Sequence, residues 1–134
     1  MTQLSSCVRL YHTTHEEARF LMQNQYYDPL RDVLAYTVLD TEVTFYLFLQ
    51  PFRAAIHDVF RAHSHTDGRI YHVMDLHEDV PGIDHVGIIQ RISKRFVVHG
   101  IPILYLNTYG HNLVLVSEEH HATALEILQE IAYV

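Results

Sequence analysis

The second half of the chain carries the clearest hydrophobic periodicity. Apolar residues recur at helical spacing between Asp84, a candidate N-cap, and Gly100, which stands where a glycine commonly ends a helix. Charged and amide side chains occupy the opposite face of this pattern. It predicts an amphipathic helix whose core positions are Val86, Ile89, Ile92, Phe96 and Val97.

Short apolar runs on both sides of this helix predict strands. Ile70–Leu76 precedes the helix, and Ile101–Asn107 and Asn112–Val116 follow it as a hairpin that turns at residues 109–111. Ser117 then caps a last helix whose first turn is acidic. The buried face of that helix is predicted to hold Ala124, Leu125, Leu128 and Ile131.

The first half repeats this order of elements more faintly. A strand is predicted at Cys7–Tyr11, followed by helical material over Thr14–Leu34 that breaks near Asp28 and Pro29. The elements predicted after that are the two strands of a hairpin, Ala35–Leu39 and Val43–Leu49, and a helix opened by Pro51.

The two halves overlay with a shift of 67 residues, which places Tyr46–Leu49 on Leu113–Val116. We therefore predict an α+β fold of two βαββαβ-like units, residues 1–67 and residues 68–134, with the boundary in the turn-rich loop that ends at Gly68. The pattern provides no clear last strand for the second unit, because only residues 132–134 follow the last helix.

Composition narrows the functions that these units can have. The chain has 134 residues, of which 49% are apolar and 19% charged, as in compact globular proteins. Its net charge of −7 disfavours binding to nucleic acid. Cys7 is the single cysteine, and no apolar run is long enough to span a bilayer. With no secretory signal over residues 1–9, we expect a cytoplasmic protein with no membrane partner.

Signatures of catalysis are absent from the sequence. It has no phosphate-binding loop, no dinucleotide glycine fingerprint, no zinc-protease helix motif and no nucleophile elbow. Cys7 lies in a predicted strand, where a buried thiol is commoner than a nucleophile. We therefore expect no catalytic residues and no cofactor.

The twelve histidines are unusually many for this length, and their full protonation would change the net charge from −7 to +5. His63 and His65 alternate as metal ligands can, but their spacing from other histidines and acidic residues is not specific for a metal. We favour solvated surface histidines and expect no bound metal.

Two segments carry candidate binding chemistry. In the first, Gly87 falls inside the first helical turn, where the missing Cβ would let a ligand approach free N–H groups, and Asp84 could bind an ammonium group. The alternative is that Asp84 only caps the helix and Gly87 only lets a strand pack. In the second, polar residues gather at the predicted hairpin end, which is also ordinary turn chemistry. These residues are Asn107, Thr108 and Asn112.

Together these segments resemble an ACT domain. The similarity rests on G-I-D-H-V-G-I-I-Q-R-I from Gly82, G-I-P-I-L-Y-L-N-T-Y from Gly100, and the stretch L-V-L-V-S-E-E from Leu113. More narrowly, they are similar to the ACT units of cytosolic arginine sensors and of small bacterial tandem-ACT proteins. The resemblance implies ferredoxin-like βαββαβ units, with an antiparallel sheet and helices on one face. It also implies side-by-side association, with small ligands, often amino acids, bound at the interfaces between units.

The resemblance carries a set of ligand-binding positions over to this chain. They come from the loop and helix start, the opening of a strand, and the hairpin end. These positions are Gly82, Ile83, Asp84, His85, Val86, Gly87, Ile88, Pro102, Ile103, Asn107, Thr108, Tyr109 and Asn112.

Two departures from the arginine sensors change the expected ligand. His85 stands where those sensors have a second carboxylate, and Asn112 stands where they have an aspartate. Less negative charge suits a neutral amino acid better than arginine. The chain has two units instead of the sensors' four, so a full set of interfaces would require a homodimer.

These features predict an amino-acid-binding regulatory module that acts through ACT–ACT interfaces on a regulated protein partner. An alternative is an ACT-fold module for dimerisation or protein interaction that binds no small ligand. A third is a small metalloenzyme that uses the histidines.

Overall fold

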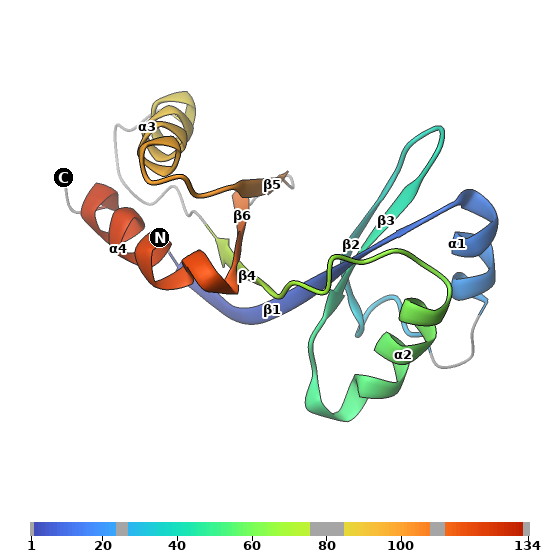
Figure 1. Ribbon diagram of the computed structural model, residues 1–134. Coiled ribbons are helices and arrows are strands. Elements are labelled where there is room, and N and C mark those ends of the chain that lie inside the picture. Colours follow the sequence, from blue (N-terminus) through green and yellow to red (C-terminus); the bar gives the residue numbers. More distant parts are fainter. Residues whose placement is uncertain (1, 24–26, 76–84, 108–111, 133–134) are drawn as a thin grey trace. The chain divides into compact units, whose positions relative to one another are not determined.

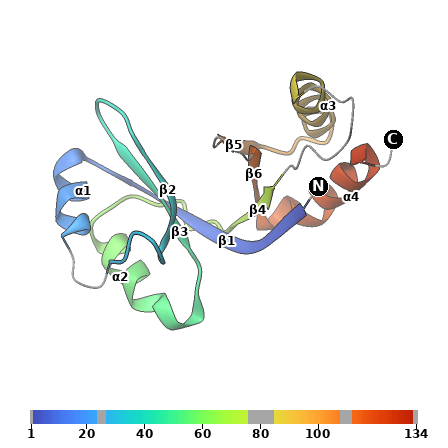
Figure 2. The ribbon, with the colours of Figure 1, turned by 180° about the vertical axis from the view of Figure 1, so that it is seen from behind.

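The computed structural model describes residues 2–23, 27–75, 85–107 and 112–132, and for residues 2–5, 85–89, 107 and 131–132 it describes the backbone alone. The chain forms two compact units (Figures 1 and 2). The N-terminal unit consists of residues 6–70. The C-terminal unit consists of residues 71–134 together with residues 1–5.

The N-terminal unit has an antiparallel sheet in the order β2-β3-β1, and β1 lies opposite β3 with Leu10 paired to Tyr46. His12 of β1 also forms an isolated antiparallel bridge with His65. The elements are β1 (Thr2–Thr13), α1 (His15–Met22), β2 (Val33–Val38), β3 (Val43–Phe48), the 3-10 helix η1 (Pro51–Arg53) and α2 (Ala54–Ala62).

An aromatic core joins the helices of this unit to its sheet. Phe60 of α2 meets Tyr11 and Phe45 edge to face, with ring centroids 5.7 and 5.0 Å away. Edge-to-face packing of this kind adds to the burial of the rings. The buried residues of this core are Tyr11, Ala18, Leu21, Val43, Phe45, Leu47, Ile56 and Phe60.

The first helix is shorter than its sequence pattern predicts. A capping box formed by Thr14 and Glu17 begins α1, as such a pair should. The helix ends at Met22, and the prediction of helical material as far as Leu34 is wrong. Asp28 accepts a hydrogen bond from the backbone N–H two residues on, which favours a turn over a helix there.

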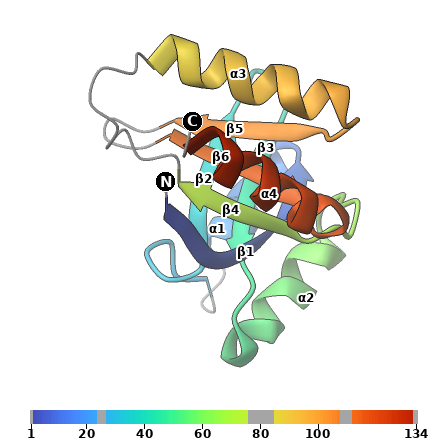
Figure 3. The same ribbon diagram turned by 90° about the vertical axis from the view of Figure 1, so that its left-hand side faces the viewer.

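The C-terminal unit has the strand order β1-β4-β6-β5, and α3 and α4 cover one face of the β4-β6-β5 part (Figure 3). Strands β4 and β5 each pair with β6 in antiparallel fashion. The elements are β4 (Tyr71–Asp75), α3 (His85–Val98), β5 (Ile103–Asn107), β6 (Asn112–Ser117), the 3-10 helix η2 (Glu118–His120) and α4 (His121–Ala132).

The missing last strand of this unit is supplied from the other end of the chain. Residues 2–5 belong to the C-terminal unit although they begin β1, whose later residues pair with β3. They occupy the sheet position beside β4. The first strand of the chain therefore takes part in both units.

The C-terminal end of α3 follows the prediction closely. Gly100 has φ +66°, the left-handed conformation that glycine adopts without strain. Its N–H donates to Val97 O, and the next N–H, of Ile101, donates to Phe96 O, as in a Schellman motif. The burial of Ile92 and Phe96 is also confirmed, but Val97 is 77% exposed, so its predicted place in the core is wrong.

The predicted start of the last helix is right in position and wrong in detail. Ser117 is the N-cap of η2, but its side chain makes no capping hydrogen bond, and α4 begins only at His121. Ala124 and Leu128 are buried as predicted, together with Ile127, which the sequence pattern missed. The two halves share this local structure, since η1 begins at residue 51 and η2 at residue 118, which is 67 positions later. The predicted α+β fold is confirmed.

Candidate functional site

The ligand-binding positions predicted from the sequence fall mainly at one end of the C-terminal unit. Gly82, Ile83, Asp84, Thr108 and Tyr109 lie outside the described residues. Residues 85–88, which are His85, Val86, Gly87 and Ile88, form the first turn of α3 and are described by their backbone.

The start of α3 and the end of the β5–β6 hairpin lie toward the same end of the sheet (Figure 3). Helix α3 ends at Val98 and β5 starts at Ile103, and the two run in opposite directions (Figure 3). A contact of 3.0 Å between Ser93 Oγ and Tyr105 Oη joins them midway. The first turn of α3 is therefore closer to the far end of β5, where Asn107 lies, than to its beginning.

Asn107 and Asn112 are paired directly across the two strands of the hairpin. Alternation along β6 puts Asn112 on the same face as Val114 and Val116, which pack beneath α3 and α4. Asn112 is half-buried there. The structure thus places Asn112, at the start of β6, on the face of the sheet that α3 covers.

Pro102 and Ile103 lie at the other end of β5. Pro102 is exposed, and Ile103 packs partly against the core of the unit. Ile103 and Asn107 are four positions apart along the strand, a span of about 13 Å. One small ligand therefore cannot touch both ends of the same β5.

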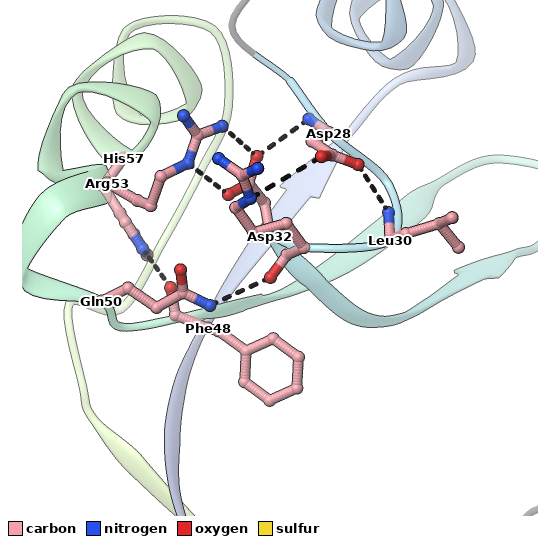
Figure 4. A network of polar contacts seen from close by, with 8 residues as sticks. Asp28, Leu30, Asp32, Phe48, Gln50, Arg53 and His57 are labelled. Atoms are coloured by element: carbon pink, nitrogen blue, oxygen red, sulfur yellow. Dashed lines mark hydrogen bonds and ion pairs between the residues drawn. The ribbon is translucent and has the colours of Figure 1, made fainter.

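The N-terminal unit contains a dense polar network around Asp32 (Figure 4). The carboxylate of Asp32, 1% exposed, accepts hydrogen bonds from Arg53 Nε at 2.7 Å and Nη2 at 2.6 Å. It also accepts the backbone N–H of Asp28 at 2.8 Å. The bonds from Arg53 are the main cause that lowers the pKa of Asp32. This network ties the 28–32 turn to the start of α2.

A second chain of hydrogen bonds links α2 to the sheet. His57, buried on α2, contacts Phe48 O through Nε2 at 2.9 Å and the Tyr11 hydroxyl through Nδ1 at 2.7 Å. A carbonyl can only accept, so Nε2 carries the proton and Nδ1 accepts from Tyr11. Burial lowers the pKa of His57, which keeps the ring neutral.

A hollow of about 330 Å³ lies beside this chain of hydrogen bonds, entirely within the N-terminal unit. Basic side chains gather at it. Burial raises the pKa of the Tyr11 hydroxyl, and the nearby guanidinium groups of Arg61 and Arg9 act in the opposite direction. The hollow is lined by Arg9, Leu49, Gln50, Pro51, Ala54, His57, Asp58 and Arg61.

Several histidines serve local structure. His12 Nδ1 lies 2.9 Å from Thr44 Oγ1, His15 Nε2 lies 2.6 Å from Leu39 O, and His63 packs on the ring of Phe20. Within the described residues, no group of three or more histidine, cysteine, aspartate or glutamate side chains is arranged to hold a metal ion.

His72 and His121 of the C-terminal unit stack on each other, with ring centroids 3.8 Å apart and planes tilted by 10°. Burial, followed by the charge of His72, lowers the pKa of His121. Glu118 lies 3.9 Å from His72. Once one ring of this pair carries a proton, its positive charge disfavours protonation of the other ring.

The sequence analysis did not identify the charged residues of the N-terminal unit. Arg9 stands alone among the apolar residues of a predicted strand, and His57 stands in the apolar face of α2 between Ile56 and Phe60. A charged or titratable residue within an apolar pattern is unusual, and this could have marked Arg9 and His57 as candidate functional residues. The Asp32–Arg53 pair had no such signal, since the partners are far apart in sequence and lie in loop-like segments.

Comparison with known proteins relates part of the chain to one family and the chain to several solved structures. The ACT domain model matches residues 72–130. No curated protein sequence matches the chain significantly. Among the described residues, no helix is both long and apolar enough to cross a membrane.

Three solved structures are similar in fold to this chain over most of its length. A protein of unknown function from Vibrio cholerae, described as a possible transport protein, has a TM-score of 0.66 at 17% identity, over 97% of this chain and 87% of its own. The aspartokinase alpha and beta subunits give 0.65 at 12% identity, over 96% and 93%. A protein described as a C-terminal regulatory domain of aspartate kinase from Porphyromonas gingivalis gives 0.55 at 14%, over 93% and 90%. At these identities the likeness concerns the fold.

Proposed function

We propose that this chain, whose residues 72–130 match the ACT domain model, is a regulatory module that binds an amino acid and has no catalytic activity of its own. The observation that carries the proposal is that the α3 start and the Asn107–Asn112 strand end lie toward the same end of the C-terminal unit. The two segments together offer the donors and acceptors that a zwitterion requires.

The proposed binding mode follows from the chemistry of a helix start. The first N–H groups of α3 have no partner within the helix, and the helix dipole is positive there. They suit the carboxylate of an amino acid. Asp84 would take the ammonium group, and Asn112 would add an amide at the strand end. Because His85 and Asn112 stand where the arginine sensors have carboxylates, a neutral side chain suits this end better than arginine.

The opposite end of β5 supports a second part of the proposal, that the working form is a homodimer. Pro102 and Ile103 lie about 13 Å along the strand from Asn107. They could contribute to the same ligand only from a second copy of the chain. The ligand would then stabilise one arrangement of the dimer, which a regulated protein partner would recognise.

A thermal-shift screen of the twenty amino acids tests the proposal, with light scattering to measure the oligomer. A ligand at about 100 times its Kd adds roughly 2.7 kcal/mol of stability, which would raise Tm by several degrees in a chain of this size. Asp84→Asn should reduce the shift strongly. Glu126→Gln makes the same charge change on the exposed side of α4 and should leave it intact.

A second candidate function is protein pairing without a small ligand. Strand β2 is at the edge of its sheet, and Tyr36, Val38 and, just beyond the strand, Leu39 are 49%, 56% and 59% exposed. Exposed apolar residues on an edge strand favour pairing with another chain. A folded dimer that no amino acid stabilises would overturn the ligand proposal and support this one.

A further inference from the structure

We propose that the hollow of the N-terminal unit binds a small monocarboxylate, anchored by Arg9 and Arg61. This site is separate from the amino-acid site proposed above, because all its lining residues belong to residues 6–70. The inference therefore stands or falls independently of that function.

The hollow has the size and lining of a small-molecule site. Its volume of about 330 Å³ is at the lower end of the range for ligand pockets. One wall is α2, another is the connection from β3 to α2, and Arg9 comes from β1. Leu49, Pro51 and Ala54 provide apolar surface beside the charged groups. This combination fits a ligand with a charged head and a short aliphatic part.

Arg9 has one donor that a ligand could use. A side-chain hydrogen bond links Arg9 to Tyr11, but Arg9 Nε is buried and has no hydrogen-bond partner among the described residues. A buried donor left unpaired is costly, so an acceptor supplied by a ligand would be favourable. A guanidinium presents paired N–H groups in the geometry that a carboxylate accepts.

The charges around the hollow favour a single negative charge on the ligand. Arg61 already contacts Asp58 at 3.0 Å, in a pair that is half exposed or more and therefore weak. His57 is neutral because its two nitrogens are committed to Tyr11 and Phe48. Two arginines and one aspartate leave one net positive charge. The carboxylate of Asp58 would repel a doubly charged phosphate more strongly than a singly charged carboxylate.

Two of the titratable residues that line the hollow are not repeated in the C-terminal unit. The shift of 67 residues places Ala124 at the position of His57 and Leu128 at the position of Arg61. Both of those residues are buried in the apolar core of the C-terminal unit. The repeated fold therefore does not require basic residues at these positions.

A titration with sodium butyrate tests the proposal, with sodium phosphate compared at equal ionic strength. Binding is followed by two-dimensional ¹H–¹⁵N NMR of the full chain, including the Arg9 Nε–H signal. We expect saturable shifts in Arg9 and in the start of α2 with butyrate and weaker ones with phosphate. Arg9→Met, which removes the charge and keeps the length, should weaken butyrate binding at least about tenfold.

Arg19→Met is the matched control, since Arg19 is an exposed arginine on α1 of the same unit. It should leave the affinity unchanged. Asp84→Asn should leave it unchanged as well, which separates this site from the amino-acid site. Three results would overturn the inference: no saturable shift, equal weakening by Arg9→Met and Arg19→Met, or tighter binding of phosphate than of butyrate. Because Arg9→Met also removes an unpaired buried donor, we expect that variant to fold.

Discussion

The hydrogen bond between Tyr11 and His57 allows a sharp test of what holds the N-terminal unit together. Tyr11 is 0% exposed and His57 is 4% exposed, and 2.7 Å separates the hydroxyl from Nδ1. Tyr11→Phe removes only the hydroxyl and leaves the ring free to keep its edge contact with Phe60. We expect this change to destabilise the unit.

The magnitude follows from what the substitution leaves behind. Nε2–H of His57 donates to Phe48 O, so Nδ1 has no hydrogen of its own and needs a donor. Leaving a buried acceptor unpaired costs about 1–3 kcal/mol. In a unit of this size each kcal/mol lowers Tm by about 4–8 °C. We therefore expect Tm to fall by at least about 4 °C.

Urea unfolding followed by far-ultraviolet circular dichroism measures this loss at about pH 8, where ordinary histidines are neutral. The control is Tyr36→Phe, which removes a hydroxyl from a ring that is 49% exposed and should change the stability by less than about 0.5 kcal/mol. If Tyr11→Phe is as stable as the control, the hydrogen bond to His57 does not stabilise the unit and our reasoning about Nδ1 is wrong.

Three further predictions concern charge and the shared strand. Burial lowers the pKa of His57 in the folded unit, while an unfolded histidine binds a proton below about pH 6.5. The unfolded state then binds more protons, so stability should fall as the pH drops from about 6.5 toward the folded pKa, and His57→Gln should flatten this slope in urea unfolding. Arg53→Met should lower the urea midpoint by leaving the carboxylate of Asp32 poorly compensated, and adding Asp32→Asn should recover part of the loss; a double variant no more stable than the single one would contradict this. Deletion of residues 1–5 should expose the edge of β4 and increase self-association measured by light scattering, and an unchanged mass distribution would argue against the role given to those residues.

Local signals in the sequence were sufficient for much of the C-terminal unit. The periodicity that ends at Gly100 predicts α3, because the helix stop depends on a few neighbouring residues and on a left-handed glycine. The hairpin of β5 and β6 follows from two apolar runs around a turn. Val97 was misplaced, since helical spacing alone does not define how wide the buried face of a helix is.

Interactions between distant residues could not be predicted in the same way. Asp32 and Arg53 are 21 positions apart, and nothing near either residue indicates the other. The fourth strand of the C-terminal unit comes from residues 2–5, at the far end of the chain. For the candidate ligand site, the residues at the α3 start and at the strand end could be identified as candidates from the sequence. Their shared location at one end of the sheet depends on the strand register.

The division of β1 between the two units has a consequence for biosynthesis. Residues 2–5 leave the ribosome well before the strand beside which they lie, β4, which begins at Tyr71. Residues 6–70 can complete their own core during translation, while residues 2–5 wait for β4 to be made. A nascent chain thus presents an open strand edge until its second half is made. A substitution in residues 2–5 that weakens their pairing with β4 would therefore interfere with the last step of folding and not with the first.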